Sequence, residues 1–193
     1  SSQLVAPFLE VEPGQRVVDA CAGAGGKTLH LASQMQNKGQ LIALDIYESK
    51  LKKLKKRARR NGVHNVETRV IDSTKVIKKL HNSADRLLLD APCSGLGVIK
   101  RNPDSKWKLE PEFVDRIMGV QQDILQNYSK MVKKGGPMVY ATCSILPQEN
   151  SEQVKKFLES ENGKDFEFVK ERNVFASETG FDGFYMALLK KKA

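Results

Sequence analysis

One stretch of the chain decides its fold: Val17-Val18-Asp19-Ala20-Cys21-Ala22-Gly23-Ala24-Gly25-Gly26-Lys27-Thr28. Its apolar start predicts a buried strand, and the glycines predict a tight turn into a helix. A turn without a ligand is the plainer interpretation, but three glycines within four residues exceed what a turn needs. Glycines here let the backbone approach a ligand and expose helix amides to it, so we expect a bound cofactor.

A carboxylate further along suggests which cofactor. Asp45 ends a second apolar run, where a nucleoside-binding fold places the acid for ribose hydroxyls. The combination indicates an adenosine-containing cofactor. A phosphate-loop nucleotidase is a rival, because Gly26-Lys27-Thr28 matches the end of that loop and Leu87–Asp90 could hold magnesium. The rival requires glycine at Cys21 and leaves Asp45 without a role.

Apolar and amphipathic runs alternate along the whole chain. Strand patterns alternating with helical ones predict an α/β fold with a doubly wound, mostly parallel sheet that binds ligands at the carboxyl ends of its strands. A closing pair of strands predicts an antiparallel C-terminal hairpin. The expected strands are Arg16–Ala20, Gln40–Asp45, Val66–Asp72, Arg86–Asp90, Met138–Cys143, Phe166–Lys170 and Phe184–Leu189, and the expected helices are Lys27–Gln36, Glu48–Arg60, Glu110–Lys133 and Gln148–Glu161.

Length and composition narrow the class of protein. The 193 residues, 40% of them hydrophobic, predict one domain, 1–193, and we expect a monomer. A net charge of +9 favours an anionic partner, with nucleic acid ahead of membrane lipid. No run is apolar enough for a membrane span and no signal peptide is seen. The abrupt start at Ser1 suggests a fragment lacking an upstream RNA-binding module.

Three cysteines without a C-x-x-C pair predict a reduced, cytoplasmic protein with no metal site. Packing is the usual role of a free cysteine, and we expect it for Cys21. Cys93 and Cys143 differ, because each lies just beyond the end of a predicted strand. Neighbouring strand ends meet at the ligand crevice, so both thiols are expected to face one pocket. A thiolate is a strong nucleophile, so this pair suggests chemistry.

Four motifs together make the sequence recognisable. They are Asp19-Ala20-Cys21-Ala22-x-x-Gly25-Gly26-Lys27-Thr28, Asp90-Ala91-Pro92-Cys93-Ser94-Gly95-x-Gly97, Arg101-x-Pro103-Asp104-x-x-Trp107 and Ala141-Thr142-Cys143-Ser144-x-x-Pro147-x-Glu149-Asn150. The chain resembles, over essentially its whole length, the Fmu/Sun (RsmB-type) family of RNA 5-methylcytosine methyltransferases. The joint presence of a Pro-Cys and a Thr-Cys loop is specific to that family.

The resemblance implies a Rossmann-like class I methyltransferase fold and S-adenosyl-L-methionine as the cofactor, with S-adenosyl-L-homocysteine as its product. It implies that Cys143 is the nucleophile and that Cys93 assists product release, with Asp90 and Lys27 near the target base. It implies a cofactor site of Ala22, Gly23, Ala24, Gly25, Gly26, Lys27, Asp45, Asp72 and Asp90. Ala24 replaces the family's usual proline, and because alanine is small we expect binding to be retained.

Cytosine chemistry needs these residue types. Carbon 5 of cytosine cannot attack a sulfonium methyl unaided, but a Cys143 thiolate added at carbon 6 makes carbon 5 nucleophilic. Asp90, protonated if burial raises its pKa, would hydrogen-bond the ring nitrogen. Cys93, or a water that it positions, would then remove the proton from carbon 5. The target base must be unpaired or extruded to be reached.

The RNA is expected to be ribosomal, with tRNA as the second choice. Two basic segments could contact it: the loop with Lys100, Arg101, Lys106, Trp107 and Lys108, and the cation-rich helix Glu48–Arg60. Trp107 could equally anchor its loop onto the domain, and such a helix is more often a solvated face. The third class of function is an RNA-binding domain without catalysis. The intact nucleophile Cys143, the acid Asp90 and the cofactor loop argue against that class.

Overall fold

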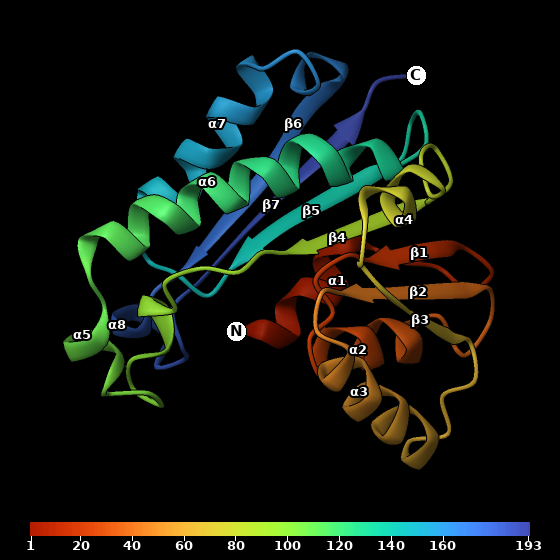
Figure 1. The fold of residues 1–193 in the computed structure, drawn as a ribbon, viewed down its shortest axis with the longest axis horizontal. Helices are drawn as coiled ribbons and strands as arrows, with labels where there is room; N and C mark the ends of the chain where they lie inside the picture. Colours follow the sequence, from red (N-terminus) through yellow and green to blue (C-terminus); the bar gives the residue numbers. More distant parts are fainter.

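A seven-stranded sheet forms the centre of the protein (Figure 1). The computed structural model describes all residues, 1–193. Its elements are α1 (Val5–Leu9), β1 (Arg16–Asp19), α2 (Gly26–Gln34), β2 (Gln40–Asp45), α3 (Glu48–Arg60), β3 (Val66–Val70), α4 (Thr74–Lys78), β4 (Arg86–Asp90), α5 (Ser105–Lys108), α6 (Pro111–Tyr128), β5 (Pro137–Thr142), α7 (Ser151–Glu159), β6 (Phe166–Val174), α8 (Ala176–Thr179) and β7 (Phe184–Lys191).

The strands lie in the order β3-β2-β1-β4-β5-β7-β6. The first five are parallel to one another, whereas β7 pairs antiparallel with both β5 and β6. The predicted doubly wound sheet with an antiparallel C-terminal hairpin is therefore confirmed. From β1 the chain adds strands in one direction, to β2 and β3, and then continues on the other side of β1 with β4 and β5. A doubly wound sheet binds its ligands at such a switch point, which here lies between β1 and β4.

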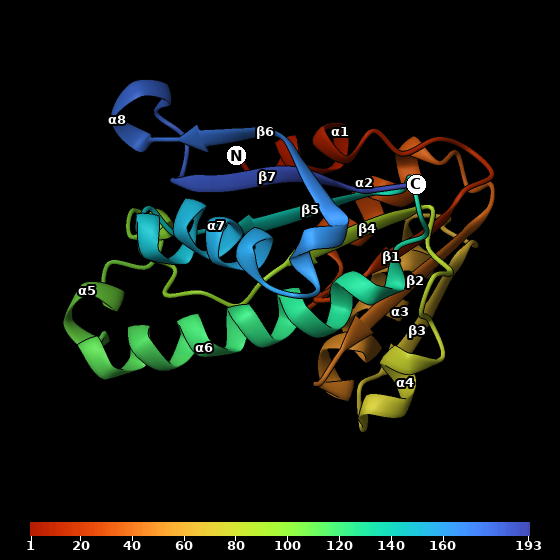
Figure 2. The ribbon, with the colours of Figure 1, turned by 90° about the horizontal axis from the view of Figure 1, so that it is seen from above.

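Both faces of the sheet carry helices, which explains why the central strands β1, β2, β4 and β5 are almost entirely buried. Neighbouring residues of β1 point to opposite sides, so that Val18 packs in the core beneath α6 and α7, whereas Val17 packs beneath α1 and α2. Figure 2 shows α6 and α7 on one face of the sheet and α1 on the other. The chain has no helix long and apolar enough to cross a membrane.

Most differences from the predicted elements lie at their ends. The helix predicted to reach Lys133 ends at Tyr128, because a 3-10 turn follows and Val132 forms a β-bridge with Ala84. The strand predicted to end at Lys170 continues to Val174, past an irregularity in its pairing with β7. The remaining shifts are of one to three residues, and the sequence did not predict the short helices α1, α4, α5 and α8.

A glycine fixes the entry of the cofactor loop into α2. Gly25 has φ +87°, in the left-handed region that favours glycine, and an added Cβ would lie 2.5 Å from the Leu54 side chain on α3. Beneath it, Thr28 donates a hydrogen bond of 2.7 Å to the buried carboxylate of Asp19. The second glycine of the loop, Gly25, is therefore required by close packing of α3 as well as by the turn.

Packing of α7 offers a test of the core on the other face. Phe157 is wholly buried, and its ring centroid lies 5.4 Å from that of Phe166. Phe157→Ala is expected to lower the free energy of unfolding by about 3–5 kcal/mol in a urea titration, because it leaves a cavity. The matched control is Phe168→Ala, at a position 47% exposed on β6, with an expected loss below about 1 kcal/mol. Equal losses would contradict this packing.

Candidate active site

Two thiols from different loops meet at the carboxyl ends of β4 and β5. Cys93 follows β4, Cys143 follows β5, and their Sγ atoms lie 3.3 Å apart, so the two thiols meet at one edge of the sheet; that they face one ligand pocket stays a prediction. Both cysteines are free and partly exposed. Since β4 and β5 are parallel neighbours, their ends bring the two thiols together although 50 residues separate them.

The two thiols share one hydrogen bond unequally. A hydrogen bond from the Cys93 thiol lowers the pKa of Cys143 below its usual value, against the opposing effect of burial, and the nearby Lys27 ammonium acts in the same direction. The same hydrogen bond, together with burial, raises the pKa of Cys93. These two directions favour Cys143 as the thiol that ionises, with Cys93 as the donor to its thiolate.

An ion pair lies beside the thiols. Lys27 at the start of α2 donates a hydrogen bond of 2.7 Å to Asp90 at the end of β4, and its Nζ lies 5.1 Å from the ring centroid of Phe184. Burial raises the pKa of Asp90 above its usual value, although Lys27 opposes that shift. Asp90 is thus a carboxyl group that takes up a proton more readily than an exposed aspartate does.

Glu149 holds the two cysteine loops together, and the sequence analysis gave it no role. Its carboxylate is fully buried and accepts hydrogen bonds from the Ser94 backbone N–H (2.7 Å), the Ser94 hydroxyl (2.5 Å), the Ser144 hydroxyl and the Gln121 amide (3.0 Å). Ser94 and Ser144 directly follow the two cysteines. One carboxylate therefore fixes the distance between the thiols.

Backbone contacts complete the same framework. The Gly97 N–H donates to the carbonyl of Cys143 (2.9 Å), and the Gly183 N–H donates to the carbonyl of Gly97 (2.7 Å). A Cβ on Gly97 would lie 2.2 Å from the Gly183 carbonyl, so glycine is required for this close approach. Arg101 forms an ion pair of 2.7 Å with Asp182, which ties the same two loops at a second point.

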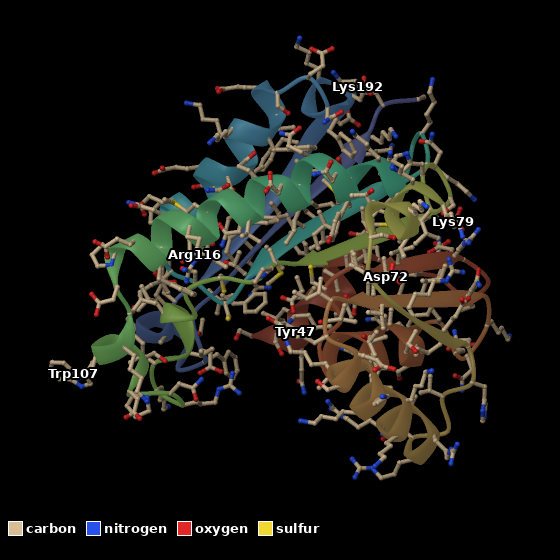
Figure 3. All side chains as sticks on the ribbon, viewed as in Figure 1. Tyr47, Asp72, Lys79, Trp107, Arg116 and Lys192 are labelled. Carbon is tan, nitrogen blue, oxygen red and sulfur yellow. The ribbon has the colours of Figure 1, made fainter.

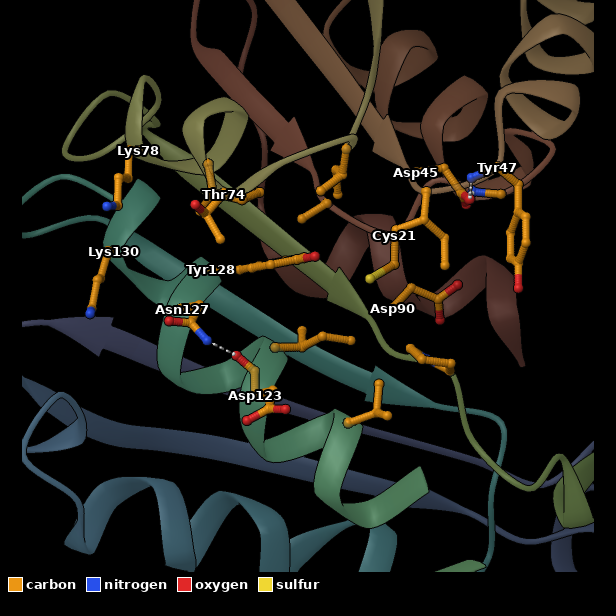
Figure 4. Close-up of a pocket in the computed structure, with 18 of the residues that line it drawn as sticks. Cys21, Asp45, Tyr47, Thr74, Lys78, Asp90, Asp123, Asn127, Tyr128 and Lys130 are labelled. Carbon is orange, nitrogen blue, oxygen red and sulfur yellow. Dashed lines mark hydrogen bonds between the residues drawn. The ribbon is translucent and has the colours of Figure 1, made fainter. Parts of the chain in front are cut away.

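A cavity of about 590 Å³ opens beside Asp90 (Figure 4). Asp45 lies at one end, where its carboxylate accepts hydrogen bonds from the backbone N–H groups of Gly23 (2.9 Å) and Tyr47 (2.8 Å). The residues that line the cavity are Ala20, Cys21, Gly23, Asp45, Ile46, Tyr47, Lys50, Ile71, Thr74, Ile77, Lys78, His81, Asp90, Pro92, Val120, Asp123, Ile124, Asn127, Tyr128 and Lys130.

Only part of the predicted cofactor set lines this cavity. Gly23, Asp45 and Asp90 do, whereas Gly26 and Lys27 line a separate hollow of about 260 Å³ near the N-terminus. The others support the loop from behind: Ala22 donates its backbone N–H to Leu44, the Ala24 carbonyl accepts from Arg57 (2.8 Å), and Gly25 packs on Leu54.

Two predicted residues need separate mention. Asp72 is exposed beyond β3, does not line the cavity and accepts a hydrogen bond from Ser73. Its part in cofactor binding stays a prediction. Cys21 packs against the larger core and lines the cavity, and burial raises its pKa well above the usual value, which makes it a poor nucleophile. The structure places Cys21 as the packing residue that the sequence suggested.

The wall of the cavity formed by α6 was missed by sequence reasoning. Val120, Asp123, Ile124 and Asn127 follow one another at helical spacing and all face the cavity. That spacing was visible in the sequence, but it led only to the prediction of a helix over Glu110–Lys133. Nothing in the spacing alone shows that part of this face borders a cavity. No group of three or more His, Cys, Asp or Glu side chains could hold a metal ion.

Together, the doubly wound sheet, the cavity beside Asp45 and the thiol pair define a Rossmann-like α/β protein with a two-cysteine site. The chain belongs to the family of 16S rRNA methyltransferases RsmB/F, whose model matches residues 6–190. It is 36% identical to the ribosomal RNA small subunit methyltransferase B of Proteus mirabilis, over 100% of this chain and 45% of that protein. The chain therefore spans about half the length of the curated relatives it matches.

Solved structures agree with the fold. The crystal structure of PH0851 is similar over 98% of this chain and 45% of that one, with a TM-score of 0.92 and 33% identity. NSun6 from Pyrococcus horikoshii, solved with SFG, is similar over 100% of this chain and 52% of that one, with a TM-score of 0.88 and 28% identity.

The hydrogen bond between the thiols gives a test by pH. A bond donated to a thiolate favours the charged form, so removal of the Cys93 thiol is expected to raise the pKa of Cys143. In Cys93→Ala, alkylation of Cys143 by iodoacetamide, followed by mass spectrometry, should reach half its maximal rate at a higher pH than in the parent. Cys21→Ala is the control and should leave the midpoint unchanged. An unchanged or lower midpoint in Cys93→Ala would show that Cys93 is not the donor.

Proposed function

We propose that this chain is the catalytic domain of an RNA (cytosine-5)-methyltransferase that transfers a methyl group from S-adenosyl-L-methionine to carbon 5 of a cytosine. The observation that carries the proposal is the pair of thiols 3.3 Å apart, with Asp90 and Lys27 beside them. A family named for 16S rRNA methyltransferases supports RNA as the substrate. Within RNA we favour ribosomal RNA over tRNA, which would place the enzyme in the cytoplasm.

The residues around the cavity fit S-adenosyl-L-methionine. Gly23 has φ +56° and no atom within 4 Å of where a Cβ would be, so a ligand has room to approach the backbone there. Asp45 offers carboxylate lone pairs to ribose hydroxyls, and Ile46 and Ile71 offer apolar surface to a base. NSun6 was solved with SFG, an S-adenosylmethionine analogue, which supports the same class of ligand here. When bound, the cofactor supplies an electrophilic methyl group on sulfur.

Cys143 begins the proposed reaction. Its thiolate forms a bond to carbon 6 of the cytosine, and Asp90 gives a proton to the ring nitrogen that gains electron density. Burial raises the pKa of Asp90, which suits a carboxyl group that must donate a proton. The Lys27 ammonium donates a hydrogen bond to Asp90 Oδ2, which holds the carboxyl in place and can be accepted by the neutral as well as by the ionised form. Carbon 5 then has the electron density to accept the methyl group.

Cys93 completes the proposed reaction. Its pKa is raised first of all by the hydrogen bond to Cys143, and that cause disappears once the Cys143 sulfur is bonded to carbon 6. Cys93 then ionises more readily and can remove the proton from carbon 5, directly or through a water that it positions. The bond from carbon 6 to sulfur breaks and the ring nitrogen returns its proton. In this scheme Cys143 acts first and Cys93 second, because the proton of their shared hydrogen bond stays on Cys93 until Cys143 has bonded to carbon 6.

Two other functions were considered. The phosphate-loop nucleotidase needs glycine at Cys21 and has no role for two adjacent thiols. Membership of the RsmB/F family argues against it. An RNA-binding domain without catalysis would not need an ion pair and a thiol pair held by a buried carboxylate. We further propose that residues 1–193 act as one catalytic domain and that this domain is a monomer.

Cofactor binding is tested by calorimetry. Asp45→Ala is expected to weaken S-adenosyl-L-methionine binding about tenfold to a hundredfold, since hydrogen bonds to a charged group contribute about 1.5–3 kcal/mol. Asp115→Ala, on an exposed part of α6 that does not line the cavity, is the control and should bind like the parent. Equal binding by Asp45→Ala, or tighter binding of ATP with magnesium, would overturn the assignment. Asp72→Ala decides separately whether that residue contributes.

The two thiols are tested by the covalent complexes they leave. Cys143→Ala is expected to abolish methylation and to form no protein–RNA adduct. Cys93→Ala should attack and methylate but stall, giving an adduct that survives denaturing gel electrophoresis and carries a labelled methyl group. Cys21→Ala keeps both thiols of the pair and should leave no stalled adduct.

The double variant combines Cys93→Ala with Cys143→Ala. Loss of the adduct in this variant would show that Cys143 forms the bond to RNA. The opposite pattern, with adducts from Cys143→Ala and none from Cys93→Ala, would exchange the roles. Full activity in both single variants would show that the two cysteines only pack in the structure, and it would remove the support for cytosine as the target.

A further inference from the structure

The outer face of α3 carries a concentration of charge that the active site does not use. Its 13 residues contain eight Lys or Arg and a single Glu, in a chain whose net charge is +9. Leu51, Leu54 and Ala58 are buried on the inner face. Nitrogen-tipped side chains project from the outer side of this helix in Figure 3. Most of the excess positive charge is therefore on one surface.

Five of these cations have no partner within the protein. Lys50 lines the cofactor cavity, Lys52 pairs with Glu48 (3.0 Å), and Arg57 donates to the Ala24 carbonyl. The remaining five are exposed and form no ion pair or side-chain hydrogen bond: Lys53, Lys55, Lys56, Arg59 and Arg60. We call these five residues the α3 cations.

Their spacing makes the α3 cations repel one another. Lys55 and Arg59 are four residues apart, as are Lys56 and Arg60, and side chains at this spacing are neighbours on a helix. A helix that is only solvated usually mixes both signs of charge, which relieves such repulsion. Here the only acid is Glu48, which already pairs with Lys52. An external polyanion would relieve the repulsion instead.

We propose that the α3 cations form a docking surface for the phosphate backbone of the RNA, separate from the site that holds the target base. This rests on the proposed function, which makes RNA the polyanion at hand. The helix is about 20 Å long at 1.5 Å per residue, enough to follow several phosphates. α3 and α5 lie toward opposite ends of the molecule in both ribbon views, so an RNA touching both the α3 cations and the loop with Trp107 extends across the domain (Figures 1 and 2).

The test variant changes the five α3 cations together to glutamine, which keeps helix propensity and leaves Lys50, Lys52 and Arg57 in place. The matched control changes five exposed cations on other elements, which also have no ion pair: Lys134, Lys155, Lys156, Arg172 and Lys190. Each variant lowers the net charge from +9 to +4. Any difference between them therefore reflects the position of the charges.

The probe is a fluorescein-labelled RNA hairpin with about two turns of duplex and unpaired cytosines in its loop. We expect the α3 variant to bind it at least about tenfold more weakly at about 0.1 M salt, with a salt slope reduced by about one for each lost phosphate contact. The control should lose much less. S-adenosyl-L-methionine affinity should be unchanged in both, and the melting temperature of the α3 variant should be equal or higher because repulsion is removed.

The outcomes separate this inference from the proposed function. Equal loss in both variants would mean that net charge alone attracts the RNA, and no loss in either would return α3 to a solvated face; both overturn the docking surface. Binding to phosphatidylglycerol vesicles without binding to the hairpin would also overturn it and point to a membrane. If the parent binds the hairpin through α3 but methylates no cytosine, the docking surface stands and the proposed function fails.

Discussion

The Glu149 carboxylate has no cation beside it, although it is completely buried. Four donors surround it instead: two from Ser94, one from Ser144 and one from Gln121. A buried charge without such donors would be very costly, so the loops that supply them cannot move apart freely. The position of each thiol in the active site depends on this one carboxylate, because Cys93 and Cys143 immediately precede the serines that it binds.

Around this carboxylate, the surrounding elements act as a frame. Tyr140 on β5 donates its hydroxyl hydrogen bond to the Glu149 carbonyl (2.7 Å), and Thr142 donates to the side chain of Asn150 (2.5 Å). Gln121 reaches the carboxylate from α6, the helix that also forms a wall of the cofactor cavity. The thiol pair and the cavity are consequently built on shared elements, which suits a reaction in which a base and a cofactor must meet.

Sequence reasoning could locate the strand ends well because they obey local rules. A glycine-rich turn, an acid at the end of a strand and two cysteines beyond strands can all be recognised from the order of residues along the chain. Parallel pairing of the strands then brings them to the same edge of the sheet. The pairing of Cys93 with Cys143 followed from that logic. Gln121 and the α6 wall did not, because their roles depend on how a helix crosses the sheet. Lys27 was expected in the cofactor loop and, with Asp90, near the target base; it does pair with Asp90, whereas its contact with Phe184 could not be seen in the sequence.

The contact of Gly183 with Gly97 has a consequence for the order in which the protein becomes active during synthesis. Gly97 binds the Cys143 carbonyl and is itself bound by Gly183, and β7, which follows Gly183, is hydrogen-bonded along β5. Chains emerge from the ribosome from the N-terminus, at about 5–20 residues per second. β1 and β2 are exposed early, whereas the loop of Cys143 lacks its flanking strand until residues 184–191 have been added. The framework that holds the two thiols is thus completed by the last strand of this region, after both cysteine loops have already been made.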